Sequence, residues 1–388
     1  MKSVILGLFV VVNLHAVGYE ELLQRAIQNN TTLKINKTKE QSIALQGQIE
    51  MRLANPNFEF EVADFSAKRV LRENQFGTRV GVSQSLLLPS LKRDKKALTQ
   101  SRVALSTQEV ALEKSEFIYG FNLYYLAYKE AVKKEILAQE ALVISQKTVA
   151  ISKARFKAGS VAKSEFLQAK IEEQGIRTLL KKLQLTGIQS RDSLLRFSNV
   201  SEAIEVETAQ YFVLSQVQNE HPLLKVTKQK EKVAKEALKV ASHKIESFEL
   251  FSEIEAEPEQ DIFRIGVSIA LPIFNQKSEE KQLAKIELNN QKLALAFEKK
   301  SLRVELFQRL EAIRTQQQLE SQYEVLIVEQ KQLLALYQEG YRVAKVNLLK
   351  LNILKEQLLQ SKEKLLETKI SIEENSIKIN YLQGAYNE

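Results

Sequence analysis

Four short segments alternate apolar and polar residues at every second position, which predicts four β-strands with two different faces. In the first segment Phe58, Phe60 and Val62 alternate with Glu59 and Glu61. The other three segments follow the same rule, so one face of each predicted strand is strongly apolar and the other carries small or charged residues. The predicted strands cover about 57–65, 76–88, 247–256 and 262–272.

Outside these strands, apolar residues follow helical spacing over very long stretches. An interior proline breaks a helix, yet no proline interrupts 90–221 or 273–388. Each descending stretch, from Ser90 to Ala158 and from Asn275 to Val343, would span about 100 Å at the rise of an α-helix. Leucine stripes on the returning stretches are spaced for packing against another helix. The predicted helices cover 19–30, 34–54, 90–154, 161–196, 275–338 and 346–385.

The chain is one structural unit written twice, because its motifs recur at a constant separation. We therefore expect two structural repeats, over 19–196 and 216–388, joined by a linker over 197–215 that forms a reduced equatorial region. Arg79, Gly81, Val82 and Ser83 recur as Arg264, Gly266, Val267 and Ser268, and Phe156, Lys157, Gly159 and Val161 align with Tyr341, Arg342, Ala344 and Val346.

The two-faced strands favour a mainly α fold that also contributes strands to a membrane β-barrel. Four strands cannot close a barrel alone, and open sheet edges invite further pairing. Helices about 100 Å long cannot be buried within one chain of this size, so their apolar stripes require partners, which cyclic association supplies. In such a barrel the apolar face meets lipid and the other face meets the lumen. The predicted lumen residues are Glu59, Arg79, Glu253 and Arg264, and the predicted lipid-facing residues are Phe58, Val80, Val82, Phe263, Ile265 and Val267.

The N-terminus has the pattern of a secretory signal over 1–18, with Met1 and Lys2 followed by an apolar run and small residues. A buried N-terminal helix is the alternative interpretation. The absence of cysteine excludes disulfides, thiolate metal sites and a lipid anchor on a processed cysteine. The net charge of +8 is spread along helix faces rather than clustered, and aromatic residues do not interleave with it, so we expect no nucleic-acid partner.

Enzymatic motifs are missing from the sequence. The segment 158–164 superficially resembles a phosphate-binding loop, but neither required glycine position holds glycine and no strand precedes it. His15 lies in the predicted signal, and His221 and His243 are isolated in the sequence, which is typical of surface histidines. We therefore expect no catalysis, no cofactor and no metal site.

Taken with these motifs, the chain resembles the TolC-type outer membrane efflux proteins over nearly its whole mature length. The resemblance rests on the duplicated order of hairpin and long helix, the junction Gly266–Asn275 and the aromatic-x-x-Gly tip from Phe156 to Gly159. It implies a trimer in the outer membrane of a Gram-negative bacterium, with a twelve-stranded barrel and a long helical tunnel. A periplasmic adaptor and an inner-membrane pump would engage the tunnel's lower end. The junction also resembles the branch that serves heavy-metal exporters of the resistance-nodulation-division class.

The resemblance also assigns roles at the two turns between the long helices, which we call the tips. Tyr341 matches the family's gating tyrosine and Glu165 an acidic partner, but the family's acidic positions after the second tip hold Lys350 and Ile353. We expect contacts from Glu165 to Lys350 or Arg342 to close the channel; ordinary solvated helix ends are the alternative. The basic excess at the tips predicts an entrance that favours anions or is neutral to cations. The expected adaptor-docking residues are Phe156, Gly159, Val161, Tyr341, Ala344 and Val346.

Three classes of function fit the pattern to different degrees. An efflux conduit for metal ions or drugs and the outer-membrane component of a type I protein secretion system differ only in the pump that supplies them. A periplasmic coiled-coil adaptor or structural rod is the third class. It gives no reason for two alternating hairpins at equivalent places of a duplicated chain.

Overall fold

The computed structural model describes residues 16–64, 76–201, 204–217, 219–257 and 259–386. The expected signal sequence falls almost entirely outside these residues, as does the basic connection between the first two strands. The described chain is mainly helical with one small antiparallel sheet, which confirms that part of the expected fold class. None of its described helices combines the length and the apolar character needed to span a bilayer.

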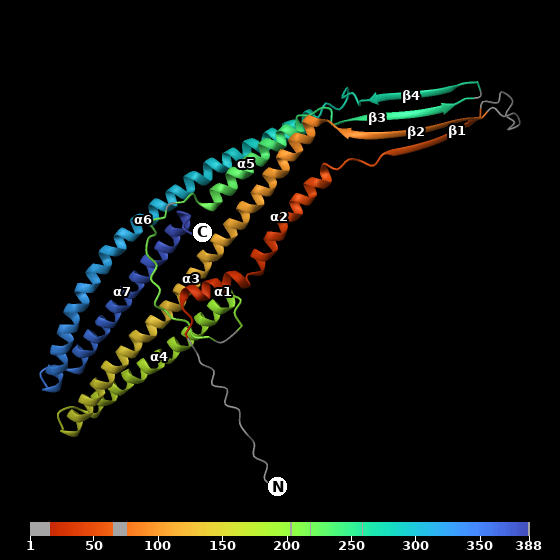
Figure 1. Cartoon of the computed structure of the whole chain (residues 1–388). Helices are drawn as coiled ribbons and strands as arrows, with labels where there is room; N and C mark the ends of the chain where they lie inside the picture. The colour runs from red at the N-terminus through yellow and green to blue at the C-terminus, as the bar shows by residue number, and fades with distance from the viewer. Residues whose placement is uncertain (1–15, 65–75, 202–203, 218, 258, 387–388) are drawn as a thin grey trace, which may run out of the picture. The chain divides into compact units, whose positions relative to one another are not determined.

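The duplication is visible in the order and lengths of the elements (Figure 1). Helices α2 and α5 both have 20 residues, and the returning helices α4 and α7 both have 35. The helices are α1 Tyr19–Asn29, α2 Thr31–Glu50, α3 Pro89–Lys157, α4 Lys163–Phe197, α5 Pro222–Ala241, α6 Ser278–Arg342 and α7 Leu348–Leu382. The strands are β1 Asn57–Asp64, β2 Phe76–Leu87, β3 Ser247–Ala256 and β4 Asp261–Ser268.

The chain divides into two compact units, and each is described by itself. The tip unit contains Met1–Leu33, Glu113–His221 and Ser301–Glu388, and the sheet unit contains Lys34–Leu112 and Pro222–Lys300. Helices α3 and α6 run through both units.

In the sheet unit, the four strands pair antiparallel in the order β1-β2-β3-β4, so β1 and β4 are its edges. The strand expected over 262–272 ends at Ser268, where its ladder with β3 stops at the Glu249–Ser268 pair. The following helix begins at Ser278 rather than 275. Pro272 lacks a backbone N–H, and Lys277 has a positive φ of 53°, so this connection cannot continue as helix.

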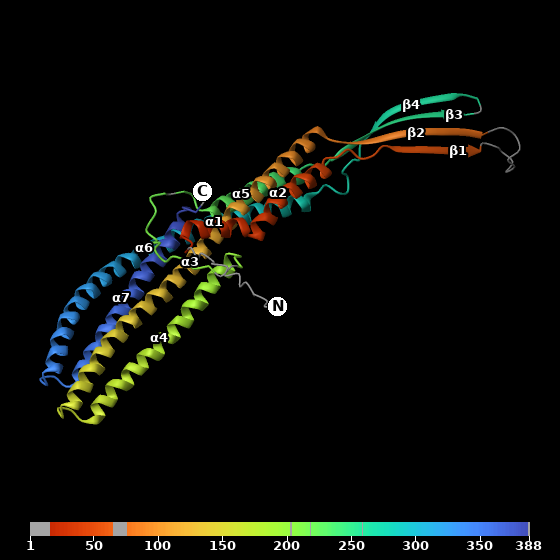
Figure 2. The same ribbon diagram turned by 60° about the horizontal axis from the view of Figure 1, so that its bottom comes forward.

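Four helices of the sheet unit continue the order of the strands, because each joins one strand: α2 leads into β1, α3 follows β2, α5 leads into β3, and α6 follows β4 (Figure 2). Helix α2 packs closely on α3, since a Cβ on Gly47 would lie 2.0 Å from Thr99 Cγ2. Helix α3 is tied to the turn after α5 by the 2.8 Å contact between His243 Nε2 and Asp94 Oδ2. Helices α2 and α6 therefore lie at the two ends of this series.

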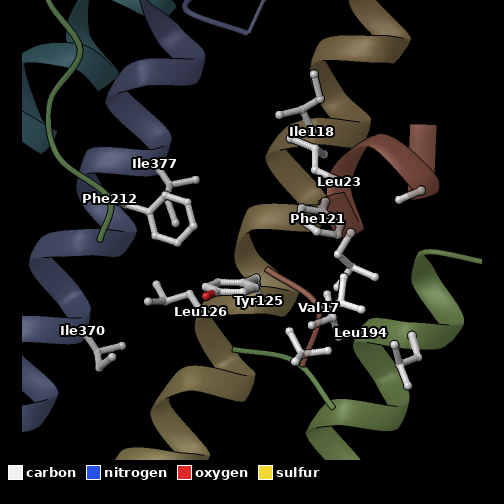
Figure 3. Close-up of a cluster of buried hydrophobic side chains, with 14 residues drawn as sticks. Val17, Leu23, Ile118, Phe121, Tyr125, Leu126, Leu194, Phe212, Ile370 and Ile377 are labelled. Carbon is white, nitrogen blue, oxygen red and sulfur yellow. The ribbon is translucent and has the colours of Figure 1, made fainter. Parts of the chain in front are cut away.

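The core of the tip unit forms where α1, α3, α4 and α7 meet the segment 199–217, which was expected to be a linker (Figure 3). Val17 pairs with Val206 as a parallel bridge, and Tyr125 Oη donates a 2.6 Å hydrogen bond to the Glu207 carbonyl. Phe212 is buried against the rings of Tyr19 and Tyr125. The described part of this segment crosses the unit without helix or extended strand and is held by side chains from both repeats.

A buried ion pair fixes the middle of this segment. Lys129 of α3 and Glu373 of α7 are both almost fully buried, and Lys129 Nζ lies 2.7 and 2.8 Å from the two carboxylate oxygens. Lys129 also donates to the Gln210 carbonyl at 2.8 Å, while Glu373 accepts from the backbone N–H of Phe212 at 3.2 Å. The pair therefore joins the first repeat, the connecting segment and the second repeat at one point.

Removing one charge of this pair should destabilise the tip unit strongly. The change Lys129→Met leaves the buried Glu373 carboxylate unpaired, a defect that costs about 3–5 kcal/mol in proteins. The double variant Lys129→Met, Glu373→Gln should recover most of that loss, because glutamine is neutral and its amide oxygen still accepts from Phe212. Urea unfolding of the three proteins measures both effects. Equal destabilisation of the single and double variants would contradict the assignment.

The tip unit should also lose stability on acidification through His221. Burial and the neighbouring Lys378 lower the pKa of His221 from 6.5 to about 4, and its ring packs edge-on against Tyr381 at 4.6 Å. Between these two pKa values the unfolded chain binds the extra proton, so the stabilisation is complete above pH 6.5 and is lost as the pH falls toward 4. Unfolding midpoints of wild type and His221→Phe at pH 7 and pH 5 check this. The variant should show the smaller loss; an unchanged pH dependence would refute it.

Candidate functional site

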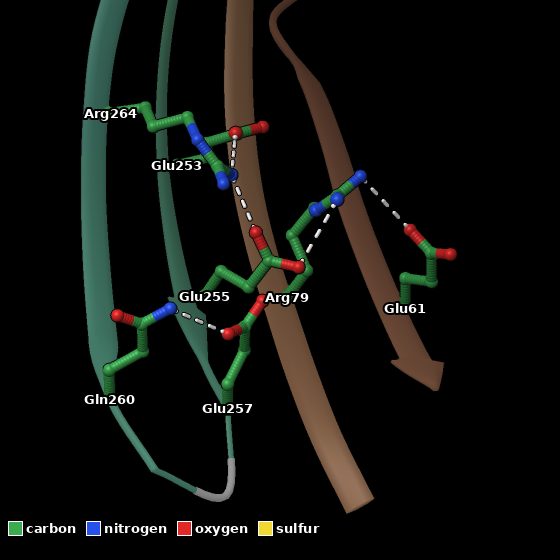
Figure 4. Close-up of polar contacts among 7 residues, drawn as sticks. All are labelled: Glu61, Arg79, Glu253, Glu255, Glu257, Gln260 and Arg264. Atoms are coloured by element: carbon green, nitrogen blue, oxygen red, sulfur yellow. Dashed lines mark hydrogen bonds and ion pairs between the residues drawn. The ribbon is translucent and has the colours of Figure 1, made fainter. Parts of the chain in front are cut away.

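The first candidate site is the charged face of the sheet, where five side chains form a ladder across all four strands (Figure 4). Arg79 on β2 lies 3.3 Å from Glu61 on β1 and 3.2 Å from Glu255 on β3. Arg264 on β4 lies 2.5 Å from the other oxygen of Glu255 and 2.6 Å from Glu253. The ladder runs Glu61, Arg79, Glu255, Arg264, Glu253, so each arginine is held between two carboxylates.

All four residues predicted for the lumen lie on this face. Arg79, Glu253 and Arg264 belong to the ladder, and Glu59 stands opposite Gly81 in the register of β1 and β2. The face is acidic overall, because the glutamates at 59, 61, 249, 253 and 255 exceed its two arginines by three negative charges. Cross-strand pairing alone could not predict that Glu255 would bridge both arginines.

Glycine is required at position 266, on the same face, because the Phe251 ring occupies the space of a side chain there. Gly266 lies opposite Phe251 in the β3–β4 register, and a Cβ at this position would lie 2.4 Å from the end of the Phe251 ring. The ring therefore covers the backbone of the edge strand, where any larger residue would displace it.

The opposite face of the sheet is apolar and uncovered. Ten of its apolar side chains are between 39% exposed, at Val80, and 78% exposed, at Ile265. A contiguous apolar surface of this kind marks a site of contact with another protein or with lipid. The residues of this apolar face include Phe58, Phe60, Val62, Val80, Val82, Leu250, Ile254, Phe263, Ile265 and Val267.

The second candidate site comprises the two tips, which end α3 and α6 with the same backbone motif. At the first, the Ser160 N–H donates to the Arg155 carbonyl at 2.8 Å, and Gly159 has φ +74°. At the second, the Lys345 N–H donates to the Gly340 carbonyl at 2.8 Å, and Ala344 has φ +63°. Both are Schellman caps, which place a left-handed residue after the helix. Glycine adopts that conformation freely, whereas alanine at 344 does so at an energetic cost.

The two tips are joined by a buried contact around Tyr341, which we call the tip latch. Tyr341 of α6 is fully buried, and its hydroxyl donates a 2.9 Å hydrogen bond to Glu165 of α4. The Arg155 guanidinium of α3 lies over the Tyr341 ring at 4.6 Å and 3.8 Å from the Glu165 carboxylate. Burial raises the pKa of Tyr341. The hydroxyl therefore stays protonated and donates at neutral pH.

The structure differs from the expected gate contacts. Within this chain Glu165 contacts Tyr341 and Arg155, whereas Arg342 pairs with Glu339 three residues earlier on its own helix at 2.6 Å. Lys350 is exposed, and its backbone N–H is capped by the Asn347 side chain at 2.9 Å. The reason is helical geometry: Arg342 follows Tyr341 by one residue and so points to a different side of α6.

The docking residues predicted at the tips differ in how exposed their side chains are. Tyr341 is buried among Leu334, Leu348 and Leu351, so its side chain is not available to a docking protein. Gly159 and Ala344 lie exposed at the turns. Phe156 is partly exposed and stacks on Phe166, while Val161 and Val346 are half-buried beside the turns.

Sequence reasoning missed the polar contacts that hold the two helical hairpins together. Lys355 of α7 reaches Glu172 of α4 at 2.5 Å, and Lys362 of α7 reaches Glu140 of α3 at 2.5 Å. Each pair joins residues far apart in the sequence, and no local pattern distinguishes them from the many other charged residues on these helices. Among the described residues no group of three or more potential ligands is placed to hold a metal ion.

Solved structures share this fold over nearly the entire chain. CusC, which folds and forms a transmembrane channel, aligns over 94% of this chain and 91% of its own with a TM-score of 0.79 and 15% identity. VceC from Vibrio cholerae covers 94% and 95% with a TM-score of 0.77 and 13% identity. The CmeC outer membrane channel of Campylobacter jejuni covers 94% and 85% with a TM-score of 0.74 and 16% identity.

The chain has the fold of outer membrane channels. At identities of 13–16% this likeness concerns the fold, and it confirms the resemblance noted from the sequence at that level. No protein-family model and no curated protein matches the sequence.

Proposed function

We propose that this protein is the protomer of a trimeric outer-membrane channel that passively conducts substrates out of the cell and catalyses no reaction. The observation that carries the proposal is the sheet, which exposes a continuous apolar face and bears a charged ladder on the other. This is the lipid-out, lumen-in arrangement of a membrane β-barrel. In water, by contrast, the exposed apolar face would have no favourable environment.

Closure of the barrel requires further copies of the chain. β1 and β4 pair on one side only among the described strands, and an open edge cannot persist in hydrocarbon because its backbone groups would lack partners. Three copies joined β4 to β1 give the twelve strands that the family resemblance implies. The long helices would then continue below the barrel as a tunnel through the periplasm.

The tips are the proposed entrance of this tunnel and the surface that meets other proteins. The strands fix the opposite end in the membrane, so the turns at Gly159 and Ala344 are the parts of α3 and α6 farthest along the helices from it. We propose that Phe156, Gly159, Val161, Ala344 and Val346 contact a periplasmic adaptor, which couples the channel to an inner-membrane pump of the resistance-nodulation-division class.

The cargo follows from the pump rather than from this chain. A metal-ion or drug exporter and a type I protein secretion system would use the same sheet and the same tips. The junction residues Leu271, Ile273 and Phe274, which suggested the heavy-metal branch, are exposed between β4 and α6, where they suit the boundary between membrane and periplasm. Copurification of the channel with its transporter discriminates between the two kinds of pump.

For the gate, we propose that the tip latch holds the closed state within each protomer. Opening the tunnel requires the α6–α7 hairpin to move away from α3 and α4, which breaks the Tyr341–Glu165 hydrogen bond and exposes the Tyr341 ring. A hydrogen bond to a charged group contributes about 1.5–3 kcal/mol, so each latch biases the equilibrium by about tenfold or more.

Variants of the latch should open the channel. The changes Tyr341→Phe and Glu165→Ala both remove the hydrogen bond, so each should raise the open probability of the purified trimer in single-channel recordings by about tenfold. Arg342→Ala is the matched control, because its exposed pair with Glu339 lies on one helix and contributes little. Lys350→Ala tests contacts between protomers: it raises the open probability only if Lys350 reaches Glu165 of a neighbouring copy. Wild-type gating in Tyr341→Phe would disprove the latch.

The channel proposal itself is tested by two arginine substitutions on one strand. Ile265→Arg places a charge on the apolar face near the middle of β4 and should cost roughly 2–4 kcal/mol in the bilayer, whereas Ser268→Arg lies on the charged face and should be mild. Membrane fractionation, the mass of the purified assembly and bilayer conductance report the outcome. Wild type and Ser268→Arg should give conducting trimers from the outer membrane, and Ile265→Arg should assemble poorly.

Two results would contradict the proposal. Equal defects in the two arginine variants would show that the faces are not distinguished by a bilayer. A wild-type chain recovered as a soluble periplasmic monomer would exclude a trimeric channel and favour an adaptor or structural rod.

A further inference from the structure

A small pocket lies between the two helical hairpins of the tip unit. Its walls come from α3 and α4 of the first repeat and from α7 of the second, and its volume is about 130 Å³. The latch residues Arg155, Glu165 and Tyr341 are not among the residues that line it, so it is a separate feature of the tip unit. The apolar lining residues are Leu137, Ala141, Ile144, Ile176, Leu358 and Leu359.

The charged residues that line the pocket leave no counter-ion for a ligand. Lys355 on α7 lies 2.5 Å from Glu172 on α4, and Lys362 on α7 lies 2.5 Å from Glu140 on α3. Glu356, the remaining charged lining residue, is exposed to solvent. A charged molecule would therefore lose its hydration on entering without gaining a free partner, and such burial is costly. The pocket is suited to a neutral molecule.

One acceptor of a lining residue has no donor. Glu172 Oε1 accepts a hydrogen bond from Lys355 Nζ, whereas Glu172 Oε2 is buried and has no hydrogen-bond partner within the described chain. The last torsion of a glutamate side chain is soft, so the carboxylate can turn this oxygen toward the pocket. A buried acceptor without a donor is costly, and a hydroxyl group supplies a donor without adding charge.

The volume of the pocket is that of a single ring. An apolar protein cavity of roughly 150 Å³ lined by aliphatic and aromatic side chains stays dry and binds benzene. The pocket here is close to that volume, and its apolar walls are aliphatic. Water is a poor occupant of such walls, because a buried water requires several polar partners.

We propose that this pocket binds small neutral ring molecules with one hydroxyl group, such as phenol, and that the bound molecule favours the closed channel. The ring lies among the apolar side chains, and the hydroxyl donates to Glu172. Because both hairpins form the walls, the movement of α6 and α7 away from α3 and α4 separates these walls. A ligand that binds one of two states shifts the equilibrium toward that state. The effect on the channel rests on the proposed gate, whereas binding requires only one folded chain.

Calorimetric titration of the purified protein with three ring molecules of similar size tests the site. Phenol should bind more tightly than toluene, which lacks the donor, and benzoate, which is charged, should not bind. In Glu172→Gln the amide oxygen still accepts from Lys355, but an amide nitrogen replaces the free acceptor. The ratio of phenol affinity to toluene affinity should therefore fall about tenfold, because a hydrogen bond to a charged acceptor is lost.

Two phenylalanine substitutions on α3 separate binding in the pocket from binding elsewhere. Ala141→Phe fills the pocket with a ring of its own and should abolish the binding of both phenol and toluene. Gln146→Phe adds the same ring at an exposed position of the same helix that does not line the pocket, and it should bind phenol as the wild type does.

Single-channel recording with phenol tests the effect on the channel. Phenol at ten times its dissociation constant should lower the open probability of the wild type about tenfold, because binding stabilises the closed state by that factor. The open probability of Ala141→Phe should not respond to phenol, which also controls for effects of phenol on the bilayer.

The outcomes distinguish this inference from the channel proposal. A conducting trimer that does not bind phenol, or whose preference for phenol over toluene is the same in Glu172→Gln, would overturn the site and leave the channel proposal standing. Phenol binding with an unchanged open probability would overturn the effect on the channel. A monomer that does not conduct would overturn the channel proposal, and phenol binding to that monomer would still support the site, because the pocket lies within one chain.

Discussion

The sheet has no interior of its own, and most other features of the chain follow from that constraint. A globular protein covers the apolar face of a sheet with helices or a second sheet. Here the residues of the apolar face remain exposed in the described chain. The backbone N–H and C=O groups at the outer edges of β1 and β4 also have no neighbouring strand among the described residues. In the proposed channel, lipid covers the apolar face and further copies of the chain pair with the two edges.

Because the chain is duplicated, both repeats contribute the same arrangement of strands and helices. The sheet places β1 and β2 of the first repeat beside β3 and β4 of the second repeat. The helices that join these strands are α2 and α3 in the first repeat and α5 and α6 in the second. In the proposed trimer, the edge strand of the second repeat pairs with the edge strand of the first repeat of the next copy. Small differences between the repeats are found at the tips. Gly159 is replaced by Ala344 at the second tip, and Phe156 by Tyr341, which supplies the hydroxyl of the tip latch.

Sequence reasoning succeeded where the physical signal is local and periodic. The alternation around Phe58 and Ile265 predicted which side of each strand is apolar, because side chains point to opposite faces in turn. The predicted last strand ran beyond Ser268, because the alternation continues there. The end of the ladder depends instead on where the partner strand ends. Sequence reasoning also paired Glu165 with Lys350 or Arg342, whereas within this chain Glu165 contacts Tyr341 and Arg155. Contacts between distant helices depend on how each helix is rotated about its own axis, which the sequence does not specify.

Polar and apolar contacts are divided between two tasks in this chain. Buried polar pairs, such as Lys129 with Glu373 and Tyr341 with Glu165, join helices of the same copy. Because an unpaired buried charge is costly, such pairs specify one arrangement of the two repeats, and the Lys129 pair does so deep in the tip unit. The apolar face of the sheet is instead exposed in this chain, and apolar surface gains free energy from burial without requiring one exact hydrogen-bond geometry. The tip latch lies between these cases: it is polar and specific, but it contains one hydrogen bond close to the end of a long hairpin. In the proposed gating, movement of the hairpin would therefore break the Tyr341–Glu165 hydrogen bond and leave the Lys129–Glu373 pair in place.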